Sequence, residues 1–153
     1  MSSEKFSFKP IGFLYTPFTN PKTTPIQPLY DNDLEGTLEV NEEYVEGLKD
    51  LEGFSHIYVI YQPHATGRPK LRIKPLMQNV ERGIFATRAH RRPNPLGLAV
   101  LKLEKIEGNI LYVTGVDMLD GTAVIDIKPY CDRFDKVVNA RGGWTQSCAE
   151  EGE

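Results

Sequence analysis

The sequence has no apolar run long enough to span a bilayer, and its first ten residues, MSSEKFSFKP, lack the apolar stretch of a signal peptide. It has only two cysteines, Cys131 and Cys148, which are too few for a disulfide scaffold. We therefore expect a cytoplasmic protein with two free thiols and no membrane segment.

Familiar catalytic patterns are also missing. The sequence contains no Walker loop, no glycine-rich turn between a strand and a helix, no GxSxG and no HExxH. The three histidines, His56, His64 and His90, are not at metal-site spacing, and no cysteine pair supports them. No metal site is expected.

The composition is that of one globular domain: 153 residues, 40% hydrophobic and 25% charged. Thirteen glycines and eleven prolines indicate many turns and favour β structure. One helix is expected, capped by Asn41 and ended by Gly53. We predict a mainly β fold, a small closed or nearly closed antiparallel β-barrel with one main helix. The expected strands cover residues 6–15, 54–61, 97–106, 110–116 and 122–128, with a short strand at Leu38 and Val40.

Charge is unevenly distributed along the chain. The formal net charge is −3, yet eight basic residues lie between Arg68 and Arg92, where Glu81 is the only acid. A local basic surface on an acidic protein favours one anionic ligand or a defined nucleic acid over nonspecific coating. The alternative is a solvated, loop-rich face with no ligand.

Two of the histidines have different settings. His56 lies inside an expected strand beside apolar neighbours, which is typical of a histidine whose hydrogen bonds are satisfied in the core. His64 follows the end of that strand beside Pro63. Loops at strand ends commonly carry binding sites, so His64 is either a site residue or an ordinary loop residue.

The first polar stretch covers residues 83–97, GIFATRAHRRPNPLG. Pro93 and Pro95 restrict the backbone around Asn94, so the nearby arginines are held on a stiff segment. A stiff arginine loop is suited to carboxylate or phosphate, because the guanidinium binds two oxygens at once. The alternative is a structural loop with exposed arginines.

The second polar stretch covers residues 117–130, DMLDGTAVIDIKPY. Asp120 and Gly121 form a turn that offers backbone groups beside a carboxylate. In the strand that follows, alternation places Asp126 and Lys128 on one face together with Thr122 and Val124. Asp126 and Lys128 are then either an exposed pair or positioned polar groups inside a barrel or dimer contact.

These stretches, as FATRAHRRPNPLGLAVLKL and DMLDGTAVIDIKPYCDRFD, together with LEGFSHIYVIYQPH, resemble the TsaA-like family, also called TrmO, of S-adenosylmethionine-dependent tRNA methyltransferases. The resemblance covers most of residues 6–135. It implies a β-barrel methyltransferase domain over residues 1–135, a C-terminal tail over 136–153, and a homodimer. It also implies S-adenosyl-L-methionine as cofactor and methylation of N6 of N6-threonylcarbamoyladenosine beside the anticodon of threonine tRNA.

The resemblance also assigns the cofactor-binding residues. Methylation of this acceptor would need a base near its N–H, for which His64, Asp120 and Tyr130 are the candidates. Arg88 and Arg91 are expected to bind the substrate, since Arg92 is assigned to the cofactor. Ala123 stands where the family usually has a proline, and Ala65 where it often has a glutamine. The expected cofactor-binding residues are Pro28, Leu29, Tyr30, His64, Ala65, Arg92, Asp120, Gly121, Thr122 and Ala123.

Two other functions remain open. A noncatalytic sensor of S-adenosylmethionine would keep the turn at Asp120 and the loop at Arg92 without needing an RNA surface. A barrel that binds nucleic acid without a cofactor would need aromatic residues among the basic ones for base stacking, and Phe85 is the only aromatic between Arg68 and Arg92. That composition disfavours the second alternative.

Overall fold

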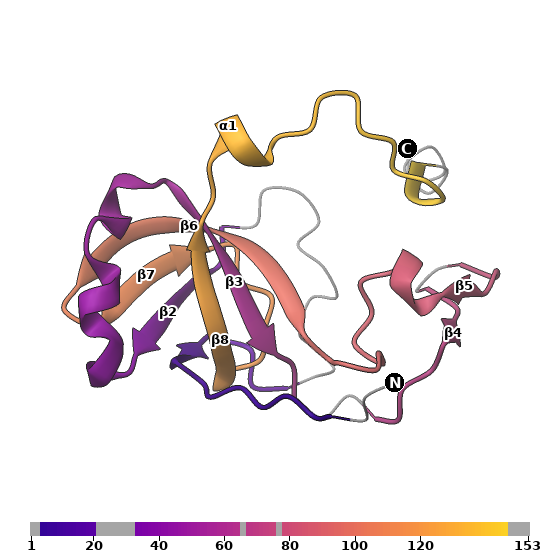
Figure 1. The fold of residues 1–153 in the computed structure, drawn as a ribbon, viewed down its shortest axis with the longest axis horizontal. Helices are drawn as coiled ribbons and strands as arrows, with labels where there is room; N and C mark the ends of the chain where they lie inside the picture. The colour runs from indigo at the N-terminus through magenta and orange to yellow at the C-terminus, as the bar shows by residue number, and fades with distance from the viewer. Residues whose placement is uncertain (1–3, 21–32, 65–66, 76–77, 147–153) are drawn as a thin grey trace.

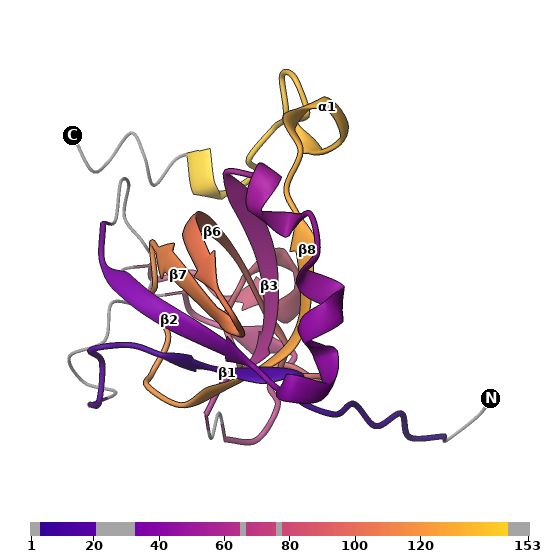
Figure 2. The ribbon, with the colours of Figure 1, turned by 90° about the vertical axis from the view of Figure 1, so that its left-hand side faces the viewer.

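The computed structural model describes residues 4–20, 33–64, 67–75 and 78–146. Six strands close into an antiparallel barrel in the order β1-β2-β7-β6-β3-β8 (Figure 2), which confirms the predicted architecture. The strands are β1 (Gly12–Tyr15), β2 (Glu35–Val40), β3 (His56–Gln62), β6 (Gly97–Glu107), β7 (Ile110–Thr114) and β8 (Thr122–Pro129).

The first strand is shorter than the sequence predicts. Strand β1 begins at Gly12, and residues 4–10 lie outside the barrel with Phe6 82% and Phe8 65% exposed. Pro10 has no N–H to donate to a neighbouring strand, so the ladder starts only after it. The first bond is made by the N–H of Ile11 to the carbonyl of Val124, at 2.8 Å.

The predicted helix is present, but as two 3₁₀ segments, η1 (Glu42–Leu48) and η2 (Leu51–Gly53). Asp50, with φ of 70°, separates them. Asn41 stands at the N-cap position, yet its side chain donates to the carbonyl of Pro10 at 3.3 Å and does not cap the helix. The segment is held by packing, because Tyr44, Leu48 and Leu51 lie against the barrel core.

Alternate residues of each strand fill the barrel interior. Thr122 is the one buried polar residue among those described, and its hydroxyl donates to the carbonyl of Leu119 at 2.6 Å. The fully buried side chains from the strands are Leu14, Leu38, Val40, Ile57, Val59, Leu101, Leu111, Val113 and Val124.

Strand β8 contains a bulge that the sequence pattern does not reveal. Ile60 pairs with Asp126, whereas the next residue, Tyr61, pairs with Val124. The extra residue switches the alternation, so that Ile127 packs against the core. The predicted single face of Thr122, Val124, Asp126 and Lys128 is therefore wrong. Asp126 and Lys128 form an exposed pair at 3.6 Å, worth under about 1 kcal/mol.

Between β3 and β6 the chain leaves the barrel as an arm, defined here as residues 67–75 and 78–96 (Figure 1). It carries β4 (Arg72–Ile73), β5 (Arg82–Gly83) and the 3₁₀ turn η3 (Ile84–Ala86). After β8 and the short helix α1 (Asp132–Asp135), the chain crosses back toward the arm. None of the helices in the described ranges is long and apolar enough to cross a membrane.

Candidate functional site

One end of the barrel brings together the segments that the sequence analysis singled out. Register partners Leu14 and Thr122 place the end of β1 beside the start of β8. Tyr61 of β3 pairs with Gly97, the first residue of β6. His64, the 115–121 turn and the loop before β6 therefore all start from this end, which we call the arm end of the barrel.

The turn at Asp120 is fixed by hydrogen bonds to segments far away in the sequence. The N–H of Asp120 donates to the carbonyl of Phe18, and that of Gly121 to the carbonyl of Leu14, each at 2.8 Å. The N–H of Thr16 donates to Asp120 Oδ1 at 3.0 Å. Gly121 has φ of 82°, which favours glycine, and a side chain there would meet nothing within 4 Å. An exposed carboxylate on a rigid, open turn results.

His64 lies next to this turn. Its Nδ1 is 3.5 Å from Thr122 Oγ1, a long and weak contact. Because the Thr122 hydroxyl already donates to Leu119, its oxygen can only accept from the imidazole. In the tautomer that donates from Nδ1 to Thr122, Nε2 is the nitrogen that can accept a proton.

Three residues absent from the expected site also lie at the arm end. Tyr61 is 7% exposed, and burial together with the charge of Asp117 raises its pKa to about 12. Burial also raises the pKa of Asp117. The ring of His90 meets the Tyr61 ring edge-on, with centroids 6.2 Å apart. Burial and the Arg92 charge lower the pKa of His90.

Arg92 organises the loop before β6. Its Nη1 donates to the carbonyl of Thr87 at 2.9 Å and to that of Ala89 at 2.8 Å. Its guanidinium also lies 6.0 Å from the centre of the Phe85 ring. The half-buried side chain thus closes the loop, and in the described chain only its Nη1 is engaged by hydrogen bonds.

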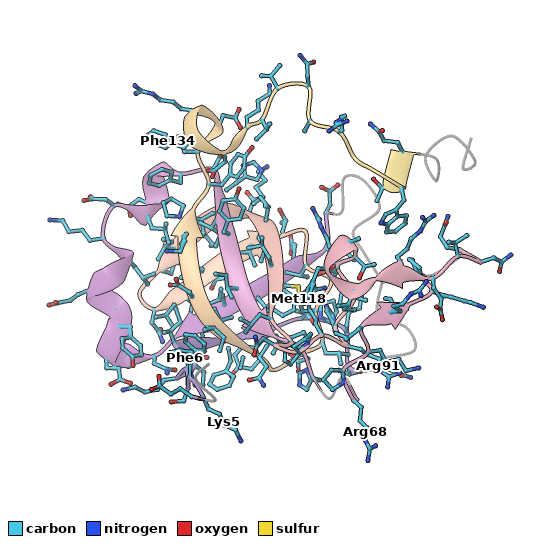
Figure 3. All side chains as sticks on the ribbon, turned by 45° about the vertical axis from the view of Figure 1, so that its right-hand side comes forward. Lys5, Phe6, Arg68, Arg91, Met118 and Phe134 are labelled. Carbon is cyan, nitrogen blue, oxygen red and sulfur yellow. The ribbon has the colours of Figure 1, made fainter. Side chains whose placement is uncertain are left out.

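The two arginines expected to bind substrate differ in setting. Arg91 is half-buried, and its Nε donates to the carbonyl of Arg68 at 3.0 Å, while its own carbonyl accepts from the N–H of Lys70. Figure 3 shows Arg91 and Arg68 close together, with Arg68 pointing outward. Arg88 is exposed. Arg91 therefore ties two segments of the arm together, whereas Arg88 faces solvent.

Tyr130 lies at the other end of the barrel. Strand β8 has eight residues between the Asp120 turn and Tyr130, a separation of about 25 Å at the usual rise per residue. Tyr130 contacts Tyr58 and His56 there, with ring centroids 5.5 and 6.2 Å away, and the hydrogen bond to Asp132 raises its pKa. Within one chain it is not part of the arm-end site, and its catalytic role stays a prediction.

The remaining expectations concern other positions. His56 has the expected hydrogen-bond partner, since its Nδ1 lies 2.8 Å from the hydroxyl of Ser55, but it is half-buried and not part of the core. Ala123 lies between Phe13 and Gln62 in the barrel wall.

No group of three potential metal ligands occurs among the residues that the structure places. Four expected cofactor contacts lie outside the described residues: Pro28, Leu29, Tyr30 and Ala65.

The arrangement defines a class: a small closed β-barrel with a polar site at one end, beside a basic arm. The family model for the tRNA-methyltransferase O N-terminal domain matches residues 13–136, and this chain belongs to that family. The chain is 48% identical over 139 residues to a probable S-adenosyl-L-methionine-binding protein of Pyrococcus abyssi, covering 91% of this chain and 76% of the relative.

Other relatives carry more specific names. A human tRNA (adenine(37)-N6)-methyltransferase is 35% identical over 138 residues, covering 86% of this chain and 31% of that protein. The crystal structure of TrmO from Pseudomonas aeruginosa superimposes with a TM-score of 0.77 at 38% identity, covering 93% of this chain and 63% of that one. This chain thus spans about a third of the human relative and under two thirds of the solved chain.

Proposed function

We propose that this protein is an S-adenosylmethionine-dependent tRNA methyltransferase. Its acceptor is N6 of N6-threonylcarbamoyladenosine beside the anticodon of threonine tRNA. The observation that carries the proposal is the exposed, rigidly held Asp120 carboxylate on the turn that leads to Thr122, which His64 contacts, at the end of the barrel from which the basic arm emerges. The names of the mammalian relatives support adenine N6 of tRNA as the acceptor.

The residues at the arm end fit the polar groups of S-adenosylmethionine. One oxygen of Asp120 is bound to Thr16, and the exposed carboxylate can still accept hydrogen bonds from ribose hydroxyls or an ammonium group. The half-buried guanidinium of Arg92 suits a carboxylate. When bound, the cofactor supplies an electrophilic methyl group on a sulfonium.

The acceptor nitrogen carries a proton that must leave when the methyl group arrives. It is flanked by a carbonyl, so it is a poor nucleophile until a base accepts this proton. Of the three candidate bases, His64 and Asp120 lie at the arm end, so they are the two that can accept this proton there. Alignment of donor and acceptor is the chain's other contribution, and the hydrogen-bonded turn provides it by fixing Asp120.

The arm supplies the surface for RNA. The stretch from Arg68 to Arg92 holds eight basic residues and one acid in a chain of net charge −3, and it stands to one side of the barrel (Figure 1). Glu81 is paired with Arg72 at 3.5 Å. Concentrating positive charge on one projecting element suits phosphates, which the acidic remainder of the chain would repel.

We further propose a homodimer formed through the outer wall of β3 and β6. Leu98 is 62% and Val100 47% exposed, and their register partners are Ile60 and Tyr58 on the same outer face. A second copy would cover this contiguous apolar patch. Sedimentation of the wild type and of Leu98→Glu tests it: a dimer that becomes a monomer is expected, and a monomeric wild type would contradict it.

The cytoplasmic location also remains our proposal, supported by the half-buried free thiol of Cys131. Retention of the protein in the soluble cytoplasmic fraction of its host is the expected result. Recovery from a secreted or membrane fraction would contradict it.

Mass spectrometry of tRNA nucleosides tests the function in cells. Cells lacking this protein should lose the methylated form of N6-threonylcarbamoyladenosine and accumulate the unmethylated form, and the wild-type gene should restore it. The alternative, a noncatalytic S-adenosylmethionine sensor, predicts identical nucleosides in both strains together with retained cofactor binding.

A further inference from the structure

Trp144 attaches the segment after the barrel to the arm. Its indole Nε1 donates to the carbonyl of Ala86 at 2.7 Å, a contact across 58 residues of sequence. The family match ends at residue 136, so Trp144 lies beyond the matched residues, whereas Ala86 lies within them. In Figure 1 the chain passes from α1 across to the arm, where this contact is made.

The same ring covers Arg82. The guanidinium of Arg82 lies 5.4 Å from the centre of the Trp144 ring, a cation–π contact. Its Nε is buried and has no hydrogen-bond partner among the described residues. Arg82 thus packs against the indole, whereas Arg68 and Arg88 of the arm are exposed to solvent.

Ala86, which Trp144 binds, is followed directly by the hydrogen-bonded arginine loop. Ala86 is the last residue of η3, and the N–H and hydroxyl of the next residue, Thr87, both donate to the carbonyl of Ile84. The carbonyl of Thr87 accepts from Arg92 Nη1, which also binds Ala89. Arg88 lies inside this closed loop, so fixing Ala86 fixes the segment that presents Arg88.

We propose that Trp144 is a positioning residue for tRNA: by holding Ala86 and Arg82, it keeps the 87–92 loop oriented to receive the anionic substrate. This inference rests on the proposed function. It concerns the RNA side of the reaction, because Ala86 and Arg82, the two residues that Trp144 holds, belong to the arm.

Kinetics of methyl transfer to threonine tRNA test the role. Trp144→Phe keeps a ring over Arg82 and loses the N–H donor, so KM for tRNA should rise about three- to tenfold, the loss typical of one hydrogen bond. Trp144→Ala should raise it further. Cofactor affinity and kcat should stay within about twofold of wild type. Val138→Ala, at an exposed position in the same segment, is the matched control and should change nothing.

Two measurements on the full chain do not need catalysis. Trp144 is the only tryptophan, so fluorescence excited selectively at tryptophan reports the surroundings of this one side chain. Arg82→Gln should shift the native emission toward that of the denatured chain. Trypsin should cleave after Arg88 several times faster in Trp144→Ala than in Val138→Ala.

Different failures separate the two proposals. If the wild type transfers no methyl group to tRNA, the proposed function fails, and normal fluorescence and proteolysis would leave the contact itself supported. If Trp144→Ala leaves KM for tRNA and cleavage after Arg88 unchanged, the positioning role is overturned. It is also overturned if cofactor affinity falls by as large a factor as KM for tRNA rises, because that result indicates general destabilisation.

Discussion

The ring of Tyr61 occupies the space that a side chain on Gly97, its partner in the β3–β6 ladder, would require. A Cβ built on Gly97 would overlap the ring carbons of Tyr61. The Tyr61 ring also contacts the ring of His90, which meets it edge-on. The glycine therefore allows a large aromatic residue to close the arm end of the barrel and to support the loop that precedes β6.

Gly97→Ala should be destabilising for this reason. The added methyl group must displace the Tyr61 ring or the backbone of β6, and overpacking of this kind costs about 1–3 kcal/mol of unfolding free energy. Urea denaturation measures the loss. Gly83→Ala is the matched control, since a Cβ there meets nothing within 4 Å. Equal stability of the two variants would contradict the packing described here.

Tyr61 should make stability fall in alkaline solution. Its folded pKa of about 12 exceeds the usual tyrosine value of 10.0, so the folded state keeps the proton more tightly. The stabilisation is fully present below pH 10 and is lost as the pH rises to 12, by about 3 kcal/mol. Tyr61→Phe, which carries no such proton, should lose less stability over this range in urea denaturation. If the free energy of unfolding falls equally with pH in both proteins, the pKa of Tyr61 is not raised.

Asp120→Ala should weaken cofactor binding. The substitution removes an exposed carboxylate and the acceptor for the Thr16 N–H. Loss of a hydrogen bond to a charged group costs about 1.5–3 kcal/mol, which is about ten- to a hundredfold in the dissociation constant. Calorimetry with S-adenosylmethionine measures it, and Asp126→Ala, which removes an exposed carboxylate elsewhere on the barrel, serves as the control. Unchanged affinity in Asp120→Ala would remove Asp120 from the site.

Arg88→Ala and Arg91→Ala should reduce tRNA methylation more than cofactor affinity. Loss of one arginine–carboxylate contact should lower kcat/KM about thirtyfold, equivalent to about 2 kcal/mol. Loss of a phosphate contact should instead make the salt dependence of tRNA binding shallower. Arg91→Ala should also speed tryptic cleavage of the arm, because its Nε holds the carbonyl of Arg68.

Activity and cofactor affinity of both variants are measured over a salt series. Wild-type methylation in both variants would show that this loop does not face the RNA. A parallel loss of cofactor affinity would assign the arginines to the cofactor instead.

Most of the barrel could be predicted from the sequence because its strands alternate and its turns carry Gly and Asn. The β6–β7 hairpin is an example: Gly108 adopts φ of 60° between the two expected strands. The bulge near Ile125 could not be predicted, since it depends on how β3 and β8 pair across the barrel. The division of the helix into two 3₁₀ segments could not be predicted either. It depends on the left-handed backbone of Asp50, and no glycine marks that position in the sequence.

The site was partly predictable for a similar reason. His64 and the Asp120 turn follow strand ends, where local sequence marks the loops. The closure of the barrel brings His64 and this turn close together, which the sequence does not show. It also adds Tyr61, His90 and Asp117 to the same end of the barrel. The attachment of Trp144 to Ala86 joins residues 58 apart with no repeating pattern between them, so the sequence predicted only a tail there.

Methyl transfer by the purified full chain tests the central claim most directly. Threonine tRNA carrying unmethylated N6-threonylcarbamoyladenosine is incubated with methyl-labelled S-adenosylmethionine and the protein, and the nucleosides are then analysed by mass spectrometry. We predict one labelled methyl group on N6 of that nucleoside, with no transfer to tRNA whose adenosine lacks the threonylcarbamoyl group. Tight cofactor binding with no label in either tRNA would contradict the account and favour the noncatalytic sensor.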